Sequence, residues 1–505
     1  MQRHNITVEF YNLKFDGNFV IDWLLNNGFE HTEEMSPMKG QFTTLISDMN
    51  KFYTITVKWE NGHITEFRDA AKKFPGMSVA GVATTFKMEI TKGEIDYHAE
   101  RPIGYQPTYD EVDYLYRDVA IVAQALHVSH ENGLTRLTVG SDSLAEFKSL
   151  MGGANNFRNV FPVLSDKMDA EIRRAYRGGF TYADPRFISR RLGAGLVLDV
   201  NSLYPSVMYN AVIPYGQPEY VDGKVDPTDI RPCTIFSVTF TAKLKPDHIP
   251  CIQIKGSVLF GSTEYLTEIA EPTTLMVTDV DWALYNDHYD IEVYAYGGGW
   301  RFKATRGLFD KYIDKWSHIK ETSEGGQRLL AKLQLNSLYG KLCSNPNVTG
   351  KIPILEDGRV RYVRGIDARK PPVYTAAGVF ITSYARDITI RAAQANYDVF
   401  AYADTDSLHL LTDRVPGTID LHPNRMGAWK HEYSFVEAHY VRAKAYLNLK
   451  EDGTYKTAWA GMADSDQKKL TFDSLKDGAQ VFGKLIPKSV PGGIVLETSP
   501  YTIKL

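Results

Sequence analysis

Three aspartates stand where apolar runs end. Asp199 follows Gly-Leu-Val-Leu, and Asp404 and Asp406 lie in Tyr-Ala-Asp-Thr-Asp-Ser between apolar residues 399–402 and 408–411. We expect Asp199 at the end of a buried strand and the other two at a hairpin tip, pointing to the same side. Carboxylates this close repel one another without a cation, and Mg²⁺ suits a few carboxylates plus phosphate oxygens. Two such ions roughly 4 Å apart would hold an attacking hydroxyl and a leaving pyrophosphate, as nucleotidyl transfer requires.

A second group of residues repeats at helical spacing. Lys332, Asn336, Tyr339 and Gly340 are spaced i, i+4, i+7 and i+8, and Arg328 lies one turn earlier on the same helix face. The cations suit triphosphate oxygens, and the ring can cover a base pair. Taken alone, the two cations also fit the solvated basic face of an ordinary amphipathic helix. The full run Lys-x-x-x-Asn-Ser-x-Tyr-Gly is more specific and favours a nucleotide site.

Two further side chains extend this hypothesis. Tyr204, just past Asp199, is placed to lie under a sugar, where its ring would clash with a ribose 2′-hydroxyl. The alternative is a Tyr that simply packs before Pro205. Lys320, upstream of the helix face, is a weaker candidate for another triphosphate contact.

The whole chain has an ordinary composition for a globular protein. Its 505 residues are too many for one core, so several domains are expected. The net charge of −4 does not indicate a nucleic-acid binder, so any DNA contact must come from local Lys and Arg clusters. The three cysteines show no metal spacing and are expected to be reduced thiols. No signal-peptide pattern and no membrane-spanning apolar run is present.

The expected elements place these residues in an alternation of strands and helices. Glu111–Glu131 keeps helical spacing at Leu115, Val119, Val122 and Leu126. Residues 211–307 contain several short strands separated by Pro and Gly. Residues 308–343 are expected to be helical, and residues 344–375 a hairpin with its turn at Glu356-Asp-Gly. The other expected strands are 6–10, 51–57, 63–67 and 195–200, and the other expected helices are 19–26 and 376–397.

Three of these segments, in this order, resemble motifs A, B and C of family B DNA polymerases. They are Asp199-Val-Asn-Ser-Leu-Tyr-Pro-Ser, Lys332-Leu-Gln-Leu-Asn-Ser-Leu-Tyr-Gly and Tyr402-Ala-Asp-Thr-Asp-Ser. Tyr11-Asn-Leu-Lys-Phe-Asp-Gly, Lys303-Ala-Thr-Arg-Gly-Leu-Phe and Pro491-Gly-Gly-Ile-Val extend the resemblance over nearly the whole chain. The resemblance is strongest to the protein-primed replicative polymerases of small tailed bacteriophages.

The resemblance implies an α/β (α+β) multidomain protein with the right-hand polymerase fold and an N-terminal ribonuclease-H-like exonuclease-type domain that lacks its first segment. The implied domains are a truncated exonuclease-like domain (1–140), a first palm segment (141–210), a first insertion that contacts terminal protein (211–307), fingers (308–343), a second, hairpin insertion (344–375), a second palm segment (376–459) and thumb (460–505).

The resemblance also implies roles for individual residues. The catalytic set is Asp199, Asp404 and Asp406, and the metal ligands are Asp199, Val200 and Asp406. The nucleotide-binding set is Tyr204, Lys320, Arg328, Lys332, Asn336, Tyr339 and Gly340. The DNA-binding set is Tyr176, Gly178, Gly179, Ser202, Lys444, Tyr446, Thr382 and Arg386. Within it, Lys444 and Tyr446 are expected on one strand face, and the glycines are expected to let backbone approach phosphate.

An exonuclease-like set is implied in the N-terminal region: Asn12, Phe15, Asp16, Lys92, Tyr97, Tyr114 and Asp118. The family's first exonuclease motif, an Asp-x-Glu, does not precede Asn12. Two carboxylates are too few for the usual metal pair, so we expect weak or absent proofreading and an unpaired sheet edge.

The implied function is replication of a phage-type linear genome from a terminal-protein primer, with processive strand displacement. The implied cofactors are two Mg²⁺ ions, with Mn²⁺ as a possible substitute, and the substrates are dNTPs. The partners are primer–template DNA and terminal protein; the enzyme is expected to be a monomer without membrane contact, in the cytoplasm of an infected bacterium.

Two other functions are weighed. An inactive homologue that binds DNA or terminal protein would not need the intact Asp199, Asp404 and Asp406 set. An RNA-making polymerase is disfavoured by Tyr204, and an RNA-copying one by Asp-Thr-Asp in place of adjacent aspartates.

Overall fold

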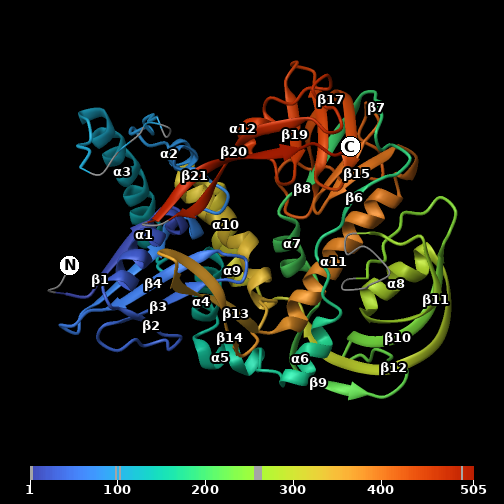
Figure 1. The fold of residues 1–505 in the computed structure, drawn as a ribbon. Coiled ribbons are helices and arrows are strands. Elements are labelled where there is room, and N and C mark those ends of the chain that lie inside the picture. The colour runs from blue at the N-terminus through green and yellow to red at the C-terminus, as the bar shows by residue number, and fades with distance from the viewer. Residues whose placement is uncertain (1–3, 97–98, 100, 102–103, 255–263, 491–492) are drawn as a thin grey trace.

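A computed structural model describes residues 4–505 except 97–98, 100, 102–103, 255–263 and 491–492. Figure 1 shows the N-terminal domain on one side, a large sheet and a second β-rich lobe on the other, and long helices between them. Among the described residues, none of the helices combines the length and the apolar character needed to cross a membrane.

The N-terminal domain is a five-stranded sheet covered by α1 (Leu13–Asn26). Its strand order is β1-β5-β4-β3-β2, and β1 is parallel to β5 at one edge. The strands are β1 (Ile6–Phe10), β2 (Glu30–His31), β3 (Gln41–Ile46), β4 (Phe52–Lys58) and β5 (Ile64–Asp69). The predicted strands are confirmed, whereas the helix predicted at 19–26 begins earlier.

Helix α3 (Tyr109–Glu131) confirms the helix predicted in this region and begins with a capping box from Thr108 and Glu111. Its predicted apolar stripe is only half buried. Val122 and Leu126 lie in the core, whereas 54% of Leu115 and 67% of Val119 are exposed. The helix therefore packs by its C-terminal half.

The large sheet carries the carboxylate motifs. Its order is β19-β18-β17-β8-β16-β15-β6, with β7 paired to β17. Its strands are β6 (Thr181–Ala183), β7 (Arg191–Leu192), β8 (Gly195–Val200), β15 (Phe400–Asp404), β16 (Ser407–Leu410), β17 (Trp429–Arg442), β18 (Ala445–Lys450) and β19 (Tyr455–Trp459). The buried-strand prediction for Asp199 and the hairpin prediction for Asp404 and Asp406 are both confirmed.

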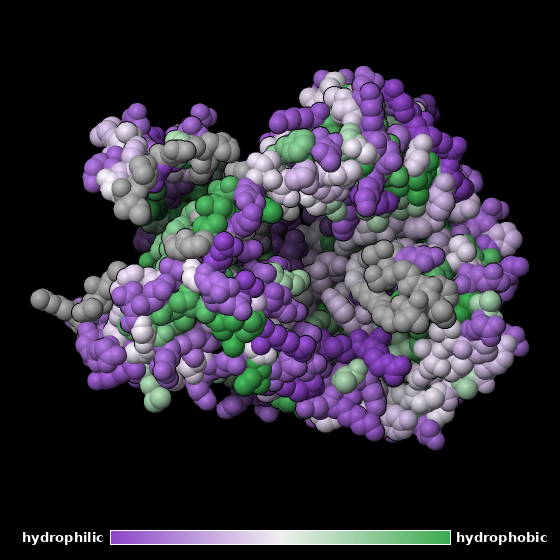
Figure 2. All heavy atoms as spheres, in the orientation of Figure 1, coloured by the Kyte–Doolittle hydropathy of each residue, from purple (hydrophilic) through white to green (hydrophobic). Residues whose placement is uncertain are grey.

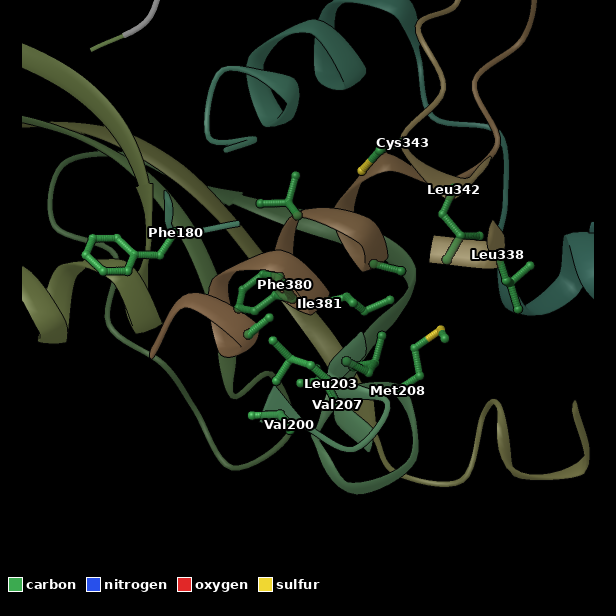
Figure 3. Close-up of a cluster of buried hydrophobic side chains, with 14 of the residues drawn as sticks. Phe180, Val200, Leu203, Val207, Met208, Leu338, Leu342, Cys343, Phe380 and Ile381 are labelled. Atoms are coloured by element: carbon green, nitrogen blue, oxygen red, sulfur yellow. The ribbon is translucent and has the colours of Figure 1, made fainter. Parts of the chain in front are cut away.

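The largest of the apolar clusters lies between this sheet and the helices beside it. Figure 3 shows Val200 at the end of β8, with Leu203 and Val207 of α7 (Leu203–Asn210), close to Phe380 and Ile381 of α11 (Thr375–Gln394). All five side chains are at most 2% exposed. Apolar packing therefore fixes the strand ends from which the aspartates project.

The described residues of 211–307, which leave out 255–263, form an antiparallel sheet of order β11-β10-β12-β9 with one helix, α8 (Asp279–His288). The strands are β9 (Ile213–Val221), β10 (Cys233–Leu244), β11 (Glu268–Thr278) and β12 (Tyr289–Thr305). The prediction of short strands is wrong. Register shifts let the strands continue through irregular positions, as at Phe236/Val238 opposite Gly299 and Tyr296.

The predicted helical stretch at 308–343 is two helices, α9 (Asp310–Thr322) and α10 (Gly325–Leu342). Ser323 and Glu324 are extended, and Gly325 takes a φ of 57°, so the chain reverses between them. The two helices pack against each other and against α4 (Val139–Leu150).

Two hairpins reach toward the N-terminal domain. β13 (Asn347–Glu356) and β14 (Arg359–Arg369) confirm the predicted hairpin and turn, where Asp357 and Gly358 both have positive φ. The Tyr362 hydroxyl donates to Asn18 of α1 at 2.6 Å. β21 (Gly493–Thr502), paired with β20 (Gln480–Val490), also contacts α1. The remaining helices are α2 (Val79–Thr85), α4 (Val139–Leu150), α5 (Ala154–Val160), α6 (Asp166–Arg173) and α12 (Asp464–Gln467).

Candidate active site

Asp199 and Asp406 lie side by side because their strands pair. In the antiparallel pairing of β16 with β8, Ser407 is opposite Asp199, and the Val200 backbone N–H donates to the Asp406 carbonyl at 2.7 Å. Both carboxylates line one cavity. Two motifs about 200 residues apart in the chain thus meet through backbone hydrogen bonds.

Asp404 differs from this pair. The expectation that Asp404 and Asp406 point the same way assumed extended backbone, but Thr405 between them is left-handed, with a φ of 63°. Asp406 faces the cavity, whereas Asp404 accepts from the Lys444 ammonium at 2.7 and 2.8 Å and from the Thr181 hydroxyl at 3.0 Å. Asp404 therefore holds a cation at the edge of the site.

The electrostatics of the pair call for a cation. Burial, together with the negative charge of Asp199 and Asp404, raises the pKa of Asp406 to about 6. A divalent ion would relieve this repulsion. Within the described residues no group of three His, Cys, Asp or Glu side chains is gathered as a metal site. The Val200 side chain is buried in the core, so only its backbone is available to an ion. Asp199, Asp406 and that backbone fit a cation whose remaining ligands come from a substrate.

The cavity has a volume of about 870 Å³. Residues of both carboxylate motifs and of helices α9 and α10 line it. Figure 2 shows the face of the molecule hollowed near its centre, between the N-terminal domain and the large sheet. The predicted residues that line the cavity are Asp199, Val200, Ser202, Lys320, Arg328, Lys332, Asn336 and Asp406. The predicted helix face is confirmed, since Leu330 and Leu338 are buried on the opposite side of α10.

Lys320 sits at the centre of the cation group. Its ammonium donates to the Ser202 hydroxyl at 2.8 Å, and its backbone carbonyl accepts from the Arg328 guanidinium. Burial and the neighbouring charges of Arg328, Lys430 and Lys332 lower the pKa of Lys320. Cations held this close together suit a polyanionic ligand such as a triphosphate.

Sequence reasoning missed Lys430, the cation that pairs with Asp199. Lys430 lies on β17 directly opposite Asp199, and its ammonium is 2.9 Å from the Asp199 Oδ1. It belongs to none of the three motifs and lies 231 positions from Asp199 in the chain. Only the pairing of β17 with β8 reveals it. Asn201, His422 and Arg425 also line the cavity and were missed.

Tyr204 and Tyr339, neither of which lines this cavity, stack on each other. Their ring centroids are 3.9 Å apart, with an angle of 20° between the planes. Burial raises the pKa of the Tyr204 hydroxyl, so this side chain is a neutral surface. Asn336, Tyr339 and Gly340 also line a second cavity of about 630 Å³, between α10 and the N-terminal domain, together with Lys51, Lys72 and Lys341. No atom lies within 4 Å of a Cβ built at Gly340, which leaves the helix surface open there.

The Tyr176–Gly179 segment supports the carboxylate turn. The Phe180 carbonyl accepts from the Thr405 N–H at 2.6 Å, and a Cβ at Gly179 would lie 2.7 Å from the Thr405 side chain. A Cβ at Gly178 would meet nothing within 4 Å. Gly179 is therefore required for backbone approach to the turn, and the approach of the Gly178 and Gly179 backbone to phosphate stays a prediction. Tyr176 is partly buried against the core.

The structure corrects the expectation that Thr382 and Arg386 contact DNA. Thr382 is 0% and Arg386 4% exposed. The Arg386 guanidinium pairs with Asp281 at 2.7 Å and donates to the backbone carbonyls of Arg177 and Gly178. Both side chains are buried, so Arg386 holds the 177–178 backbone in place, while the Thr382 hydroxyl donates to the Gly378 and Val379 carbonyls of its own helix.

The expectation that Lys444 and Tyr446 share a strand face is also wrong. Lys444 lies in the turn between β17 and β18 with a φ of 58°, so the period-two rule does not apply. Its ammonium is exposed beside Asp404, while Tyr446 is 8% exposed and packs against Tyr402 and Tyr440.

The exonuclease-like residues are spread over several local interactions. Asn12 takes a φ of 72°, and its N–H donates to Asp69 at 3.0 Å; Asp69 also pairs with Lys72. Burial raises the pKa of Asp16, with a smaller effect from Asp69.

On α3, Asp118 pairs with Lys92 at 3.3 Å, while its Oδ1 is buried without a hydrogen-bond partner among the described residues. The Lys92 ammonium also lies 5.4 Å from the Tyr114 ring centre, and Phe15 packs edge-on against Phe19. Tyr97 lies outside the described residues.

Comparisons with known proteins agree over most of the chain. The family described as DNA polymerase type B, organellar and viral, matches residues 100–420. The DNA polymerases of Bacillus phage B103 and Bacillus phage phi29 are each 43% identical over 520 residues, covering 98% of this chain and 90% of each relative. The DNA polymerase of Streptococcus phage Cp-1 is 33% identical, covering 98% of this chain and 87% of its own length. The solved structure of phi29 DNA polymerase with primer-template DNA and incoming nucleotide has a TM-score of 0.93 at 42% identity, covering 100% of this chain and 92% of that one.

Proposed function

Because this chain belongs to the type B DNA polymerase family, organellar and viral, and is a DNA-directed DNA polymerase with the right-hand fold, we propose that the cavity beside Asp199 and Asp406 is its nucleotidyl-transfer site. The observation that carries this proposal is the convergence of two repelling carboxylates with the Lys320, Arg328 and Lys332 cations in one cavity. On one side, Asp199 and Asp406 share a single nearby ammonium, that of Lys430, and on the other, the three helix cations outnumber the nearby Glu321 carboxylate. A metal-bound triphosphate would satisfy both.

Asp199, Asp406 and the Val200 backbone would hold the divalent ions, for which we propose two Mg²⁺, with Mn²⁺ as a substitute. When bound, such ions lower the pKa of the attacking 3′-hydroxyl and neutralise the departing pyrophosphate. Lys320, Arg328 and Lys332 would bind the triphosphate oxygens of a dNTP, with Asn336 beside them.

The stacked Tyr204 and Tyr339 rings would lie under the sugar and base, where Tyr204 would exclude a ribose 2′-hydroxyl. The Asp404–Lys444 pair, at the edge of the site, would orient the primer end. Asp404 would act there through Lys444 and not as a ligand.

The DNA path is supported by the second cavity and by the two hairpins. Lys51, Lys72 and Lys341 line that cavity from both of its sides, as contact with a phosphate backbone requires. The hairpins β13–β14 and β20–β21 both contact α1 of the N-terminal domain (Figure 1). We propose that these two hairpins, together with the N-terminal domain, surround the primer–template DNA. Binding of this kind would give a monomeric enzyme its processivity and its strand displacement.

The remaining assignments follow the similarity to phage polymerases. They comprise an exonuclease-like domain at 1–140, palm at 141–210 and 376–459, fingers at 308–343, insertions at 211–307 and 344–375, and a thumb at 460–505. The first insertion would contact a terminal protein that primes a linear genome, in the cytoplasm of an infected bacterium. Proofreading would be weak, since Asp118 pairs with Lys92 and few carboxylates are available there to hold a metal pair.

The test is extension of a 5′-labelled primer on a longer template with Mg²⁺, with and without dNTPs. We expect full-length product only with dNTPs, no shortening of the primer without them, and no extension by Asp406→Asn. Retained DNA binding by that variant is the control for folding. Undiminished extension by Asp406→Asn would refute the site, and DNA binding without extension by the unmodified protein would favour an inactive binding homologue. Primer shortening without dNTPs would refute weak proofreading.

A further inference from the structure

Lys430 occupies a fixed place at the base of the nucleotide cavity. Antiparallel pairing of β17 with β8 sets Lys430 opposite Asp199 and Trp429 opposite Val200. Trp429 is 6% exposed in the core, so the strand cannot slide without exposing it. The Lys430 side chain points the other way and is 38% exposed. Its position is therefore set by the sheet, while its ammonium remains movable.

The ammonium lies between the carboxylates and the helix cations. It is 2.9 Å from the Asp199 Oδ1. Its charge also lowers the pKa of Asp406 on one side and contributes to lowering the pKa of Lys320 on the other. Lys430 thus comes from the large sheet and faces α9 and α10, whose cations line the opposite wall.

The same Asp199 carboxylate is a proposed metal ligand, so ammonium and divalent ion compete for it. A divalent ion binds a carboxylate more strongly than an ammonium does, because its charge is higher. Once the ion is bound, Lys430 loses its partner, and its long side chain needs another anion. The triphosphate is the anion that enters the cavity together with the ion.

The numbers of acidic and basic side chains in the cavity support a transfer of the Lys430 ammonium to the triphosphate. The carboxylates that line it are Asp199, Glu321 and Asp406, and the cations are Lys320, Arg328, Lys332, Arg425 and Lys430. Arg425 already pairs with Asp420, outside the cavity lining. The other four cations outnumber the three carboxylates of the lining. They suit a polyanion with oxygens on several sides.

We propose that Lys430 is a triphosphate-binding residue of this polymerase. Asp199 holds its ammonium in the cavity before the nucleotide arrives, and the outer phosphates of the dNTP then take it over. It stays with them as pyrophosphate leaves. This inference rests on the nucleotide site proposed above and adds to it a contact from the sheet, opposite the helix cations.

The test measures nucleotide affinity separately from catalysis. The next complementary dNTP is titrated, with Ca²⁺, into the enzyme bound to a primer–template whose primer ends in a dideoxynucleotide. We expect Lys430→Met to weaken dNTP binding about tenfold and Lys430→Arg to stay within about twofold. Inhibition of primer extension by inorganic pyrophosphate should weaken in parallel. The matched control is Lys450→Met on the neighbouring strand β18, whose partner Asp452 lies outside the cavity, and it should change nothing.

A second readout distinguishes binding from competition. Mn²⁺ binding to the enzyme without nucleotide, followed by electron paramagnetic resonance, should be unchanged or tighter in Lys430→Met, because the competing ammonium is gone. Tighter Mn²⁺ binding with unchanged dNTP affinity would overturn the proposal, since Lys430 would then only compete with metal. A fall in melting temperature together with lost DNA affinity would also overturn it and assign a structural role. If Lys332→Met leaves dNTP affinity unchanged as well, the proposed nucleotide site itself is refuted.

Discussion

The polymerase cavity and the exonuclease-like region both contain acidic side chains, but the charged groups around those side chains differ. Asp199 and Asp406 are set side by side by strand pairing, and burial together with the charges of Asp199 and Asp404 raises the pKa of Asp406. In the N-terminal region Asp118 pairs with Lys92, and Asp69 pairs with Lys72. Lys430 pairs with Asp199, but Asp406 is still repelled by Asp199 and Asp404, and a ligand can relieve this repulsion. In the N-terminal region lysines pair with both Asp118 and Asp69, and burial is the main cause of the raised pKa of Asp16. An arrangement that is costly without its ligand is the better indicator of function.

The largest expected effect comes from removing one carboxylate in each region. Asp199→Asn should lower the rate of primer extension at least about 1,000-fold, because it removes a metal ligand. Asp118→Asn should leave extension within about twofold. Single-turnover extension assays on both variants, with DNA binding as the folding control, check this. Comparable losses in the two variants would contradict the contrast between the regions.

A smaller effect is expected from the backbone that supports the carboxylate turn. Gly179→Ala should slow extension roughly tenfold, because the new methyl group would press on Thr405 and move Asp406. The matched control is Gly193→Ala, which adds a methyl group in open space outside the lining of both cavities and should be silent. Steady-state extension rates decide this; equal rates for the two alanine variants would show that the turn tolerates displacement.

The smallest effect is on stability. A carboxyl with a raised pKa binds its proton more tightly in the folded state, so its contribution is present at low pH and is lost as pH rises through about 6. Without metal, Asp406→Asn should therefore stabilise the protein by about 1 to 2 kcal/mol at pH 8 and give little gain near pH 4. Asp118→Asn should give no such gain, because it breaks the pair with Lys92.

Thermal unfolding of both variants in EDTA across that pH range provides the measurement. A pH-independent gain for Asp406→Asn would mean that packing, and not repulsion, is responsible. Equal gains in the two variants would remove the distinction between the regions.

Local sequence patterns predicted what depends on local physics. The hairpin at 356–358, the helix face of Lys332, Asn336 and Tyr339, and the strand ending in Asp199 were all found as expected. Each depends on a turn, a helical period or an apolar run. The period-two argument failed at Thr405 and Lys444, where a single left-handed residue redirects the chain and no residue type announces it. Arg386 was misplaced for a different reason, because a charged residue on a helix can be buried when a distant Asp281 pairs with it.

The sequence by itself determined the chemistry available to this protein: three aspartates, a cationic helix face and two tyrosines, in an order typical of one polymerase family. Only the tertiary structure decided which of these residues meet. Strand pairing brought Asp406 to Asp199, sent Asp404 to Lys444, and put Lys430, which no motif marks, next to a proposed metal ligand. The physical reason is that periodicity sets the direction of a side chain within its own element, whereas the register between elements depends on hydrogen bonds and packing across the whole chain.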